Sequence, residues 1–221
     1  NDLRWETMTL LAHGAFGTMV DKTAYDGWLD PVFYQRLATV FQEADEKRKH
    51  FGQPLHADVG IYFSHRTRDW LGRENAAKAW QGTLGTHKAL VYAHVPWGIV
   101  LDENAELERL QSFPVVALPN IGILLESEVA ALTAYVEAGG NLIITGATGL
   151  HDRYGNPRDT SALEKLIGGR WKQTLDSKDN HIRFKKTESD SPFAKGIPAD
   201  WPFLVHGNAV VYEPITARTW G

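Results

Sequence analysis

Short runs of nearly continuous apolar residues recur through the chain after residue 58. They are Val59–Ser64, Ile99–Leu101, Val115–Leu118 and Leu142–Thr145. Each run is too short for a helix and shows no alternation of apolar and polar positions. Such runs are typical of parallel strands that are covered on both faces. The pattern therefore predicts a buried parallel sheet.

Helical spacing of apolar residues separates these runs. Trp80, Leu84, His87 and Val91 fall on one helical face, and Ser161 to Ile167 and Glu106 to Leu110 read as shorter helices. A further stripe, Val129, Leu132 and Val136, has Ser127 as its expected N-cap and Gly139-Gly140 as its stop. Alternating strands and helices predict an α/β fold, a flavodoxin-like doubly wound parallel sheet.

The first 55 residues have a different pattern. A short helix from Glu6 to Ala12 is followed by a predicted strand, Phe16–Val20, and by a polar loop. Asp30-Pro31 then starts a second helix, because Asp caps free N–H groups and Pro suits the first helical position. We expect residues 1–55 and 56–221 to form separate domains, with residues 1–55 an N-terminal β/α segment. The start at Asn1 without Met suggests a piece of a longer protein.

The pattern changes again after Gly169. His181–Lys185 and Ala209–Tyr212 read as strands, separated by a turn-rich stretch at residues 189–202. These strands either extend the sheet in antiparallel fashion or open a further domain. The pattern does not decide between the two.

The amino-acid composition excludes several classes of function. The 221 residues carry 23 Lys and Arg against 27 Asp and Glu, and no cysteine. A net charge of -4 argues against a nucleic-acid partner. The absence of cysteine excludes disulfides, thiolate metal sites and a cysteine nucleophile, and it favours a cytoplasmic location. No apolar run approaches the length needed to span a bilayer, so no membrane partner is expected.

Motifs for cofactors and catalysis are missing. Residues 145–149, Thr-Gly-Ala-Thr-Gly, lack the lysine and the spacing of a phosphate loop, and neither G-x-S-x-G nor H-E-x-x-H occurs. We therefore expect no cofactor, no metal ion and no catalytic residue in this chain.

Polar residues at the strand ends are the candidate binding site, since ligands of parallel sheets bind at the carboxyl ends of strands. These ends are Ser64-His65-Arg66, Asp102-Glu103, Pro119-Asn120 and Thr145-Gly146-Ala147. The candidates are Ser64, Arg66, Arg68, Asn120 and Thr145. Together with Asp69, the two arginines either bind sugar hydroxyls or a carboxylate, or form a surface ion-pair network.

Asp21 and Asp26 are a second candidate pair. They follow the predicted N-terminal strand, and paired carboxylates suit glycoside chemistry. Asp26-Gly27 is also an ordinary turn sequence, and the turn is the favoured interpretation for Asp26.

Four segments carry a resemblance to a known family: Asp58–Ser64, His94–Asp102, Val115–Asn120 and Glu137–Gly146. A strand ending in Pro, a helix ending in Gly-Gly and a strand ending in Thr-Gly follow in that order. This stretch resembles the class I glutamine amidotransferase-like domain of multidomain glycoside hydrolases, and is similar to the β-galactosidase trimerisation domain of glycoside hydrolase family 42. Amidotransferases use a cysteine after a sharp strand-to-helix turn, which this chain lacks.

The resemblance implies that residues 1–55 are the last strand and helix of a (β/α)8 barrel whose catalytic carboxylates lie on earlier strands. It implies a non-catalytic domain that supports assembly or shapes a substrate site, in a homo-oligomeric protein. Two alternatives remain: a module that binds a carbohydrate or a small carboxylate, and a self-contained hydrolase that uses Asp21 and Asp26.

Overall fold

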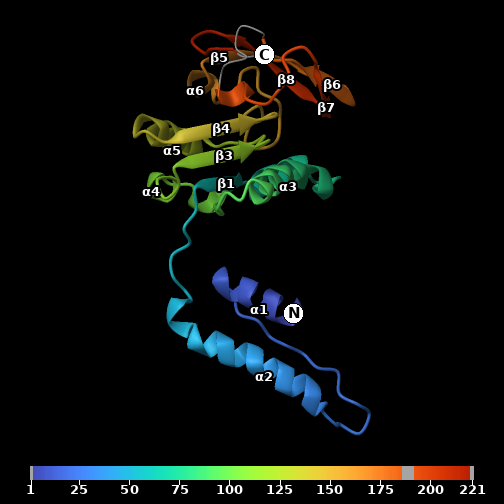
Figure 1. Cartoon of the computed structure of the whole chain (residues 1–221). Helices are drawn as coiled ribbons and strands as arrows, with labels where there is room; N and C mark the ends of the chain where they lie inside the picture. The colour runs from blue at the N-terminus through green and yellow to red at the C-terminus, as the bar shows by residue number, and fades with distance from the viewer. Residues whose placement is uncertain (1, 186–191, 220–221) are drawn as a thin grey trace. The chain divides into compact units, whose positions relative to one another are not determined.

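The computed structural model describes residues 2–185 and 192–219 (Figure 1). The chain divides into two compact units, Asn1–His56 and Ala57–Gly221.

The first unit is a pair of helices, α1 (Asp2–Ala12) and α2 (Pro31–Glu46), followed by a 3-10 turn, Arg48–His50. Asp30 caps α2 as expected, accepting a hydrogen bond from the Val32 N–H at 2.9 Å. Arg4 joins the two helices, since its Nη2 donates to Glu43 Oε1 at 2.6 Å.

The strand predicted at Phe16–Val20 is wrong. These residues form no regular secondary structure, and Phe16 and Val20 are 87% and 84% exposed. A strand needs a neighbour to bond its N–H and C=O groups. Among the described residues of this unit there is no other strand, so the local apolar pattern alone does not form one.

A four-stranded parallel sheet organises the second unit, in the order β2-β1-β3-β4. The strands are β1 (Val59–Phe63), β2 (Trp97–Leu101), β3 (Val115–Pro119) and β4 (Asn141–Thr145). The chain leaves β1 for β2 on one side and then crosses to β3 on the other. The sheet is therefore doubly wound, which confirms the predicted α/β fold class.

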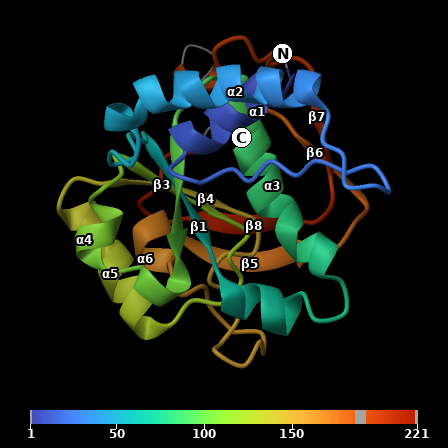
Figure 2. The same ribbon diagram turned by 90° about the horizontal axis from the view of Figure 1, so that it is seen from below.

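Helices cover both faces of this sheet. Figure 2 shows α3 (Ala76–Tyr92) on one side of the strands and α4 (Leu107–Leu110) and α5 (Glu126–Glu137) on the other. The main core lies on the α4–α5 side, where Tyr62, Leu118, Leu132 and Tyr135 are fully buried. The Tyr135 hydroxyl donates to the Phe113 carbonyl at 2.8 Å, so this buried polar atom is satisfied.

The start of α5 differs from the prediction. Ser127 lies inside the helix, and Leu125 is the N-cap residue. Glu128 performs the capping, because its Oε2 accepts the Leu125 N–H at 2.7 Å. A glutamate in the first turn bonds a free N–H and also complements the helix dipole, so it replaces the expected serine cap.

Four strands in the described residues after Gly168 form two antiparallel ribbons, each a two-stranded sheet separate from the parallel sheet. One pairs β5 (Gly169–Leu175) with β8 (Ala209–Pro214), and the other pairs β6 (Asp179–Ile182) with β7 (Phe203–His206). A short helix, α6 (Glu164–Ile167), precedes them. The predicted strand at His181–Lys185 ends early, at Ile182. The turn-rich stretch at residues 189–202 begins outside the described residues.

The outer strand β2 has one open edge. On this strand the Ile99 carbonyl accepts a hydrogen bond from Arg109 Nη2 at 2.9 Å. The Arg109 guanidinium also lies over the Phe113 ring, 4.9 Å from its centroid. A single side chain from α4 thus occupies an acceptor of the edge strand.

Candidate functional site

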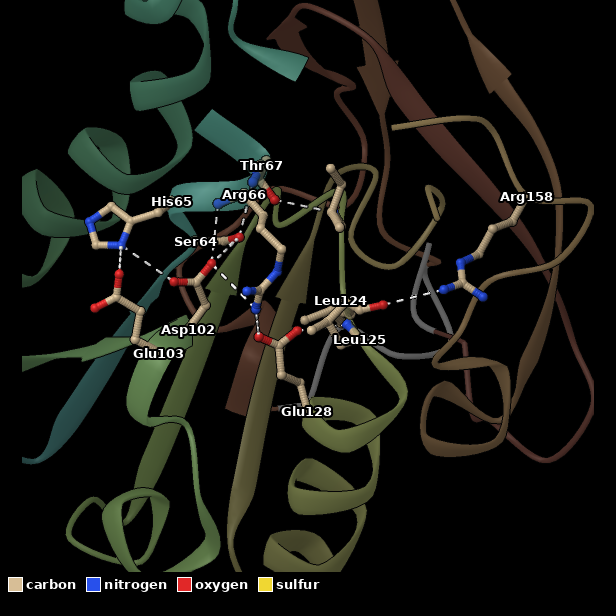
Figure 3. Close-up of polar contacts among 11 residues, drawn as sticks. Ser64, His65, Arg66, Thr67, Asp102, Glu103, Leu124, Leu125, Glu128 and Arg158 are labelled. Carbon is tan, nitrogen blue, oxygen red and sulfur yellow. Dashed lines mark hydrogen bonds and ion pairs between the residues drawn. The ribbon is translucent and has the colours of Figure 1, made fainter. Parts of the chain in front are cut away.

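The carboxyl ends of β1 and β2 bring together two buried polar residues, Ser64 and Asp102. These strands pair in register, with Phe63 opposite Leu101, so Ser64 and Asp102 leave the sheet side by side. The side chain of Asp102 is only 1% exposed. Its Oδ2 accepts hydrogen bonds from Ser64 Oγ at 2.9 Å and from the Arg66 N–H at 3.2 Å (Figure 3).

The Ser64 hydroxyl is fully engaged in this network. It donates to Asp102 and accepts the Thr67 N–H at 3.0 Å. Thr67 in turn accepts the Ile123 N–H through Oγ1 at 3.1 Å, which links the turn after β1 to the loop after β3. A buried hydroxyl with both roles taken holds the loop in place.

Arg66 connects the loop after β1 to α5. Its guanidinium forms an ion pair with Glu128 and lies 3.5 Å from Asp102 Oδ2. Burial raises the pKa of Glu128, while the Leu125 N–H and the Arg66 charge act in the opposite direction. Burial also raises the pKa of the neighbouring Tyr62 phenol, and the charges of Glu128 and Asp102 raise it further.

His65 faces the other oxygen of Asp102. Its Nδ1 lies 3.4 Å from Asp102 Oδ1 and 3.4 Å from Glu103 Oε1. Neither Asp102 Oδ1 nor His65 Nδ1 has a hydrogen-bond partner within the described part of the chain. These three side chains are grouped closely enough to hold a metal ion.

Arg68 lies apart from this network. Its Nε donates to the carboxylate of Asp69 at 2.6 Å; the Arg68 side chain is partly exposed and that of Asp69 is exposed. For Arg68, the structure thus matches the surface ion-pair interpretation.

Asn120 and Thr145 meet at the ends of β3 and β4. The Asn120 N–H donates to the Thr145 carbonyl at 3.2 Å, and Asn120 Oδ1 accepts the Ala147 N–H at 2.9 Å. Asn120 has a φ of +59°, a left-handed conformation that asparagine tolerates better than most residues. Its amide therefore fixes the crossing from one strand end to the next.

A cavity of about 1160 Å³ opens beside Asn120. Thr67, Asn75, Gln81 and His151 also line it, whereas Ser64, Arg66 and Thr145 are not among its lining residues. Burial lowers the pKa of His151, which keeps this imidazole neutral near pH 7. The predicted strand-end residues thus form two groups, a buried network around Asp102 and a cavity wall around Asn120.

Asp21 and Asp26 do not line a common cavity in the first unit. Asp21, Lys22 and Tyr25 line a shallow hollow there that does not include Asp26. Asp26 Oδ1 accepts the Trp28 N–H at 3.1 Å, which is the turn geometry expected for an Asp-Gly sequence.

Asp102, Glu103 and Glu128 were not among the candidates from sequence. Asp102 and Glu103 occupy a predicted strand end, and the order of the strands alone would have placed them beside Ser64. Glu128 carried no such signal, because its spacing also fits an ordinary first-turn glutamate. None of the helices in residues 2–185 and 192–219 combines the length and apolar character that crossing a bilayer requires.

Comparisons with known proteins extend this description. The family described as β-galactosidase trimerisation domain matches residues 57–193. No curated protein sequence matches the chain.

Solved structures of glycoside hydrolases resemble the chain over nearly its full length. A GH42 β-galactosidase from G. stearothermophilus has a TM-score of 0.75 at 16% identity, over 98% of this chain and 33% of that chain. The β-galactosidase from Bacillus circulans sp. alkalophilus has a TM-score of 0.74 at 14% identity, and the match covers 99% of this chain and 34% of that chain. The α-L-fucosidase isoenzyme 2 from Paenibacillus thiaminolyticus has a TM-score of 0.66 at 16% identity, and the match covers 96% of this chain and 30% of that chain. This chain spans about a third of each, and such low identities show the fold alone.

Proposed function

The chain belongs to the β-galactosidase trimerisation domain family, and we propose that it is an accessory domain of a glycoside hydrolase that holds subunits together and does not cleave glycosides itself. The observation that carries this proposal is an incompletely covered apolar face on the α3 side of the sheet.

α3 has no fully buried residue along its 17 positions. Trp80 stacks on Phe63 with ring centroids 4.6 Å apart, which fixes the inner side of the helix. Leu84, Val91 and Tyr92 are exposed. Leu84 and Val91 lie on the same helical face as Trp80, so part of the apolar stripe of α3 is left uncovered by the sheet, which favours a protein partner.

The sheet beneath α3 is also covered only in its centre. Ile99, Ile61, Ala117 and Ile143 lie in one row across the four strands. The inner pair is buried, whereas Ile99 and Ile143 on the outer strands are 46% and 52% exposed. Parallel sheets are covered on both faces across their width, so a second copy of the chain is the occupant we expect beside α3. In a closed trimer this face contacts a different face of the next copy.

The polar network around Asp102 supports the non-catalytic part of the proposal. Ser64, Arg66 and Glu128 bond to Asp102, to one another or to backbone groups. This network stabilises the loop after β1. Although Ser64 Oγ donates to Asp102, the Ser64 side chain is buried and does not line the cavity beside Asn120, so the pair does not face a ligand there.

Sedimentation of the 221-residue chain tests the assembly. We expect a species of three times the 24.7 kDa chain mass, and we expect Leu84→Arg to shift it toward the monomer. Ile215→Arg is the matched control, because Ile215 is an exposed apolar residue beyond the end of β8. A monomeric wild type at micromolar concentration, or a Leu84→Arg variant that assembles normally, contradicts the proposal. Assays with chromogenic galactosides and fucosides are expected to show no turnover.

The first unit is part of the same proposal. We assign residues 1–55 to the last segment of a (β/α)8 barrel, an assignment supported by the structural likeness over 98% of the chain. In a longer protein, neighbouring barrel strands would supply partners for Phe16–Val20. A crystal structure of the longer protein in which these residues remain irregular would contradict this assignment.

Carbohydrate or carboxylate binding is a second candidate, favoured by the cavity beside Asn120. Its size suits a small ligand, and the amides of Asn75, Gln81 and Asn120 suit hydroxyl groups. Calorimetric titration with a panel of sugars and small carboxylates tests it, and uniformly flat traces would remove it. A hydrolase that uses Asp21 and Asp26 has less support, because Asp26 is committed to its turn.

A further inference from the structure

We propose that His65, Asp102 and Glu103 form a binding site for a divalent transition-metal ion of the Zn²⁺ type. The proposal is independent of the assembly proposed above. It rests on the positions of three donor atoms and on one buried oxygen that lacks a partner.

The donor atoms come from two neighbouring strand ends. His65 follows β1, and Asp102 and Glu103 follow β2, so the parallel pairing of the two strands sets their spacing. One ligand atom from each residue lies within 4.8 Å of the other two. Imidazole nitrogen and carboxylate oxygen are both common Zn²⁺ ligands.

Two of the three ligand separations match those of a tetrahedral ion. His65 Nδ1 lies 3.4 Å from Asp102 Oδ1 and 3.4 Å from Glu103 Oε1. With metal–ligand distances of about 2.0–2.1 Å, two ligands of a tetrahedral Zn²⁺ lie about 3.3–3.4 Å apart. Each carboxylate therefore lies at the distance from the imidazole that a tetrahedral ion requires. Figure 3 shows the imidazole and both carboxylates turned toward one another.

The state of Asp102 Oδ1 supports a metal ion independently of the ligand spacing. The side chain is 1% exposed, and within the described part of the chain this oxygen accepts no hydrogen bond. A buried carboxylate oxygen without a donor is costly, and a bound cation removes that cost. The other oxygen of Asp102 is held by Ser64 and by the Arg66 N–H, an outer shell of the kind that orients metal ligands.

The local charge also suits a divalent cation. Arg66 lies against both Glu128 and Asp102, so one guanidinium faces two carboxylates, and Arg68 is paired with Asp69. Glu103 adds a further carboxylate beside the imidazole. Glu103 is largely exposed, so solvent reaches the fourth coordination position. Three protein ligands and one open position are the arrangement of zinc sites that bind water or a further ligand.

Calorimetric titration of the 221-residue chain with ZnCl₂ tests the site. We expect one equivalent to bind, and we expect Glu103→Gln and His65→Gln each to weaken binding on the order of 10- to 100-fold or more. Glu103 is an exposed residue, so its variant is expected to keep the fold. His206→Gln is the matched control. It removes an exposed histidine that lies 2.7 Å from Asp179 in the β6–β7 ribbon, outside the proposed site, and it is expected to leave the Zn²⁺ affinity unchanged.

A wild-type chain that shows no saturable Zn²⁺ binding would overturn the proposal. So would binding that survives unchanged in Glu103→Gln and His65→Gln, or binding that is lost in His206→Gln. Circular dichroism of each variant separates loss of the ion from loss of the fold. Tetrahedral absorption bands from Co²⁺ in place of Zn²⁺ are the second expected readout, and their absence in a chain that binds Co²⁺ contradicts the geometry.

Discussion

The guanidinium of Arg66 and the carboxylate of Glu128 form an ion pair between residues 62 positions apart, at the carboxyl edge of the sheet. Glu128 also caps α5. The Glu128 carboxylate thus connects the loop after β1 to the N-terminal end of α5.

Glu128 predicts a pH dependence of stability. Burial raises its folded pKa above the ordinary value of 4.5, so its contribution to stability is full below pH 4.5 and declines as the pH rises through the raised pKa. We expect the free energy of unfolding of the wild type, relative to Glu128→Gln, to fall over that interval. Urea unfolding at a series of pH values measures it, and a difference that is constant with pH would contradict the expectation.

Two glycines of α3 predict opposite effects of the same substitution. A Cβ on Gly82 would lie 2.6 Å from the Pro119 carbonyl oxygen, whereas a Cβ on Gly85 meets nothing within 4 Å. Gly82→Ala is expected to destabilise by about 1–3 kcal/mol, since backbone must move. Gly85→Ala is expected to stabilise by about 0.5–1 kcal/mol, the ordinary helix preference. Thermal unfolding of the pair decides, and equal effects would show that α3 does not approach β3 this closely.

Asn120 predicts a ranking of variants. Its left-handed φ of +59° favours asparagine or glycine, and its amide oxygen binds the Ala147 N–H. Asn120→Gly loses only the hydrogen bond, whereas Asn120→Ala also incurs the left-handed backbone cost, about 1–2 kcal/mol. We expect unfolding free energies in the order wild type, Gly, Ala. An alanine variant as stable as the glycine variant would show that the turn has no such constraint.

Glu43 predicts a shifted titration in the first unit. Hydrogen bonds from Arg4 and Lys47 lower its pKa from 4.5 to about 2. The depressed pKa means that its contribution to the α1–α2 pairing is present above pH 4.5 and is lost as the pH falls toward 2. NMR titration of the Glu43 carboxyl measures the midpoint. Arg4→Gln is expected to raise it, and Arg48→Gln, which removes the partner of Asp45, is expected to leave it unchanged.

The parallel sheet was predictable because its strands are apolar on both faces and separated by helices with clear stops. Val59–Phe63, Val115–Pro119 and Asn141–Thr145 begin and end within a residue or two of their predicted bounds. Phe16–Val20 failed because a strand depends on partners that a local pattern does not contain. β5 and β7 were missed because β5 consists mostly of polar residues, and because the apolar run of β7 has only three residues and directly follows a turn-rich stretch.

The candidate site was predictable only in part. Rules for parallel sheets place Ser64, Arg66, Asn120 and Thr145 at one edge, and the structure has them there. Ser64 and Arg66 belong to the buried network and Asn120 to the cavity wall, and this division depends on rotamers and on Glu128, which is distant in sequence. The orphaned oxygen of Asp102 is a property of three-dimensional packing that no spacing rule conveys.

Arg109 has a consequence for colloidal behaviour. Arg109 occupies the Ile99 carbonyl, one of the hydrogen-bond acceptors through which the edge strand β2 could pair with a strand of another molecule and aggregate. This contact at the edge of β2 is separate from the α3 face through which we propose that the subunits assemble. Replacing Arg109 with alanine should leave assembly through α3 intact while making concentrated solutions turbid.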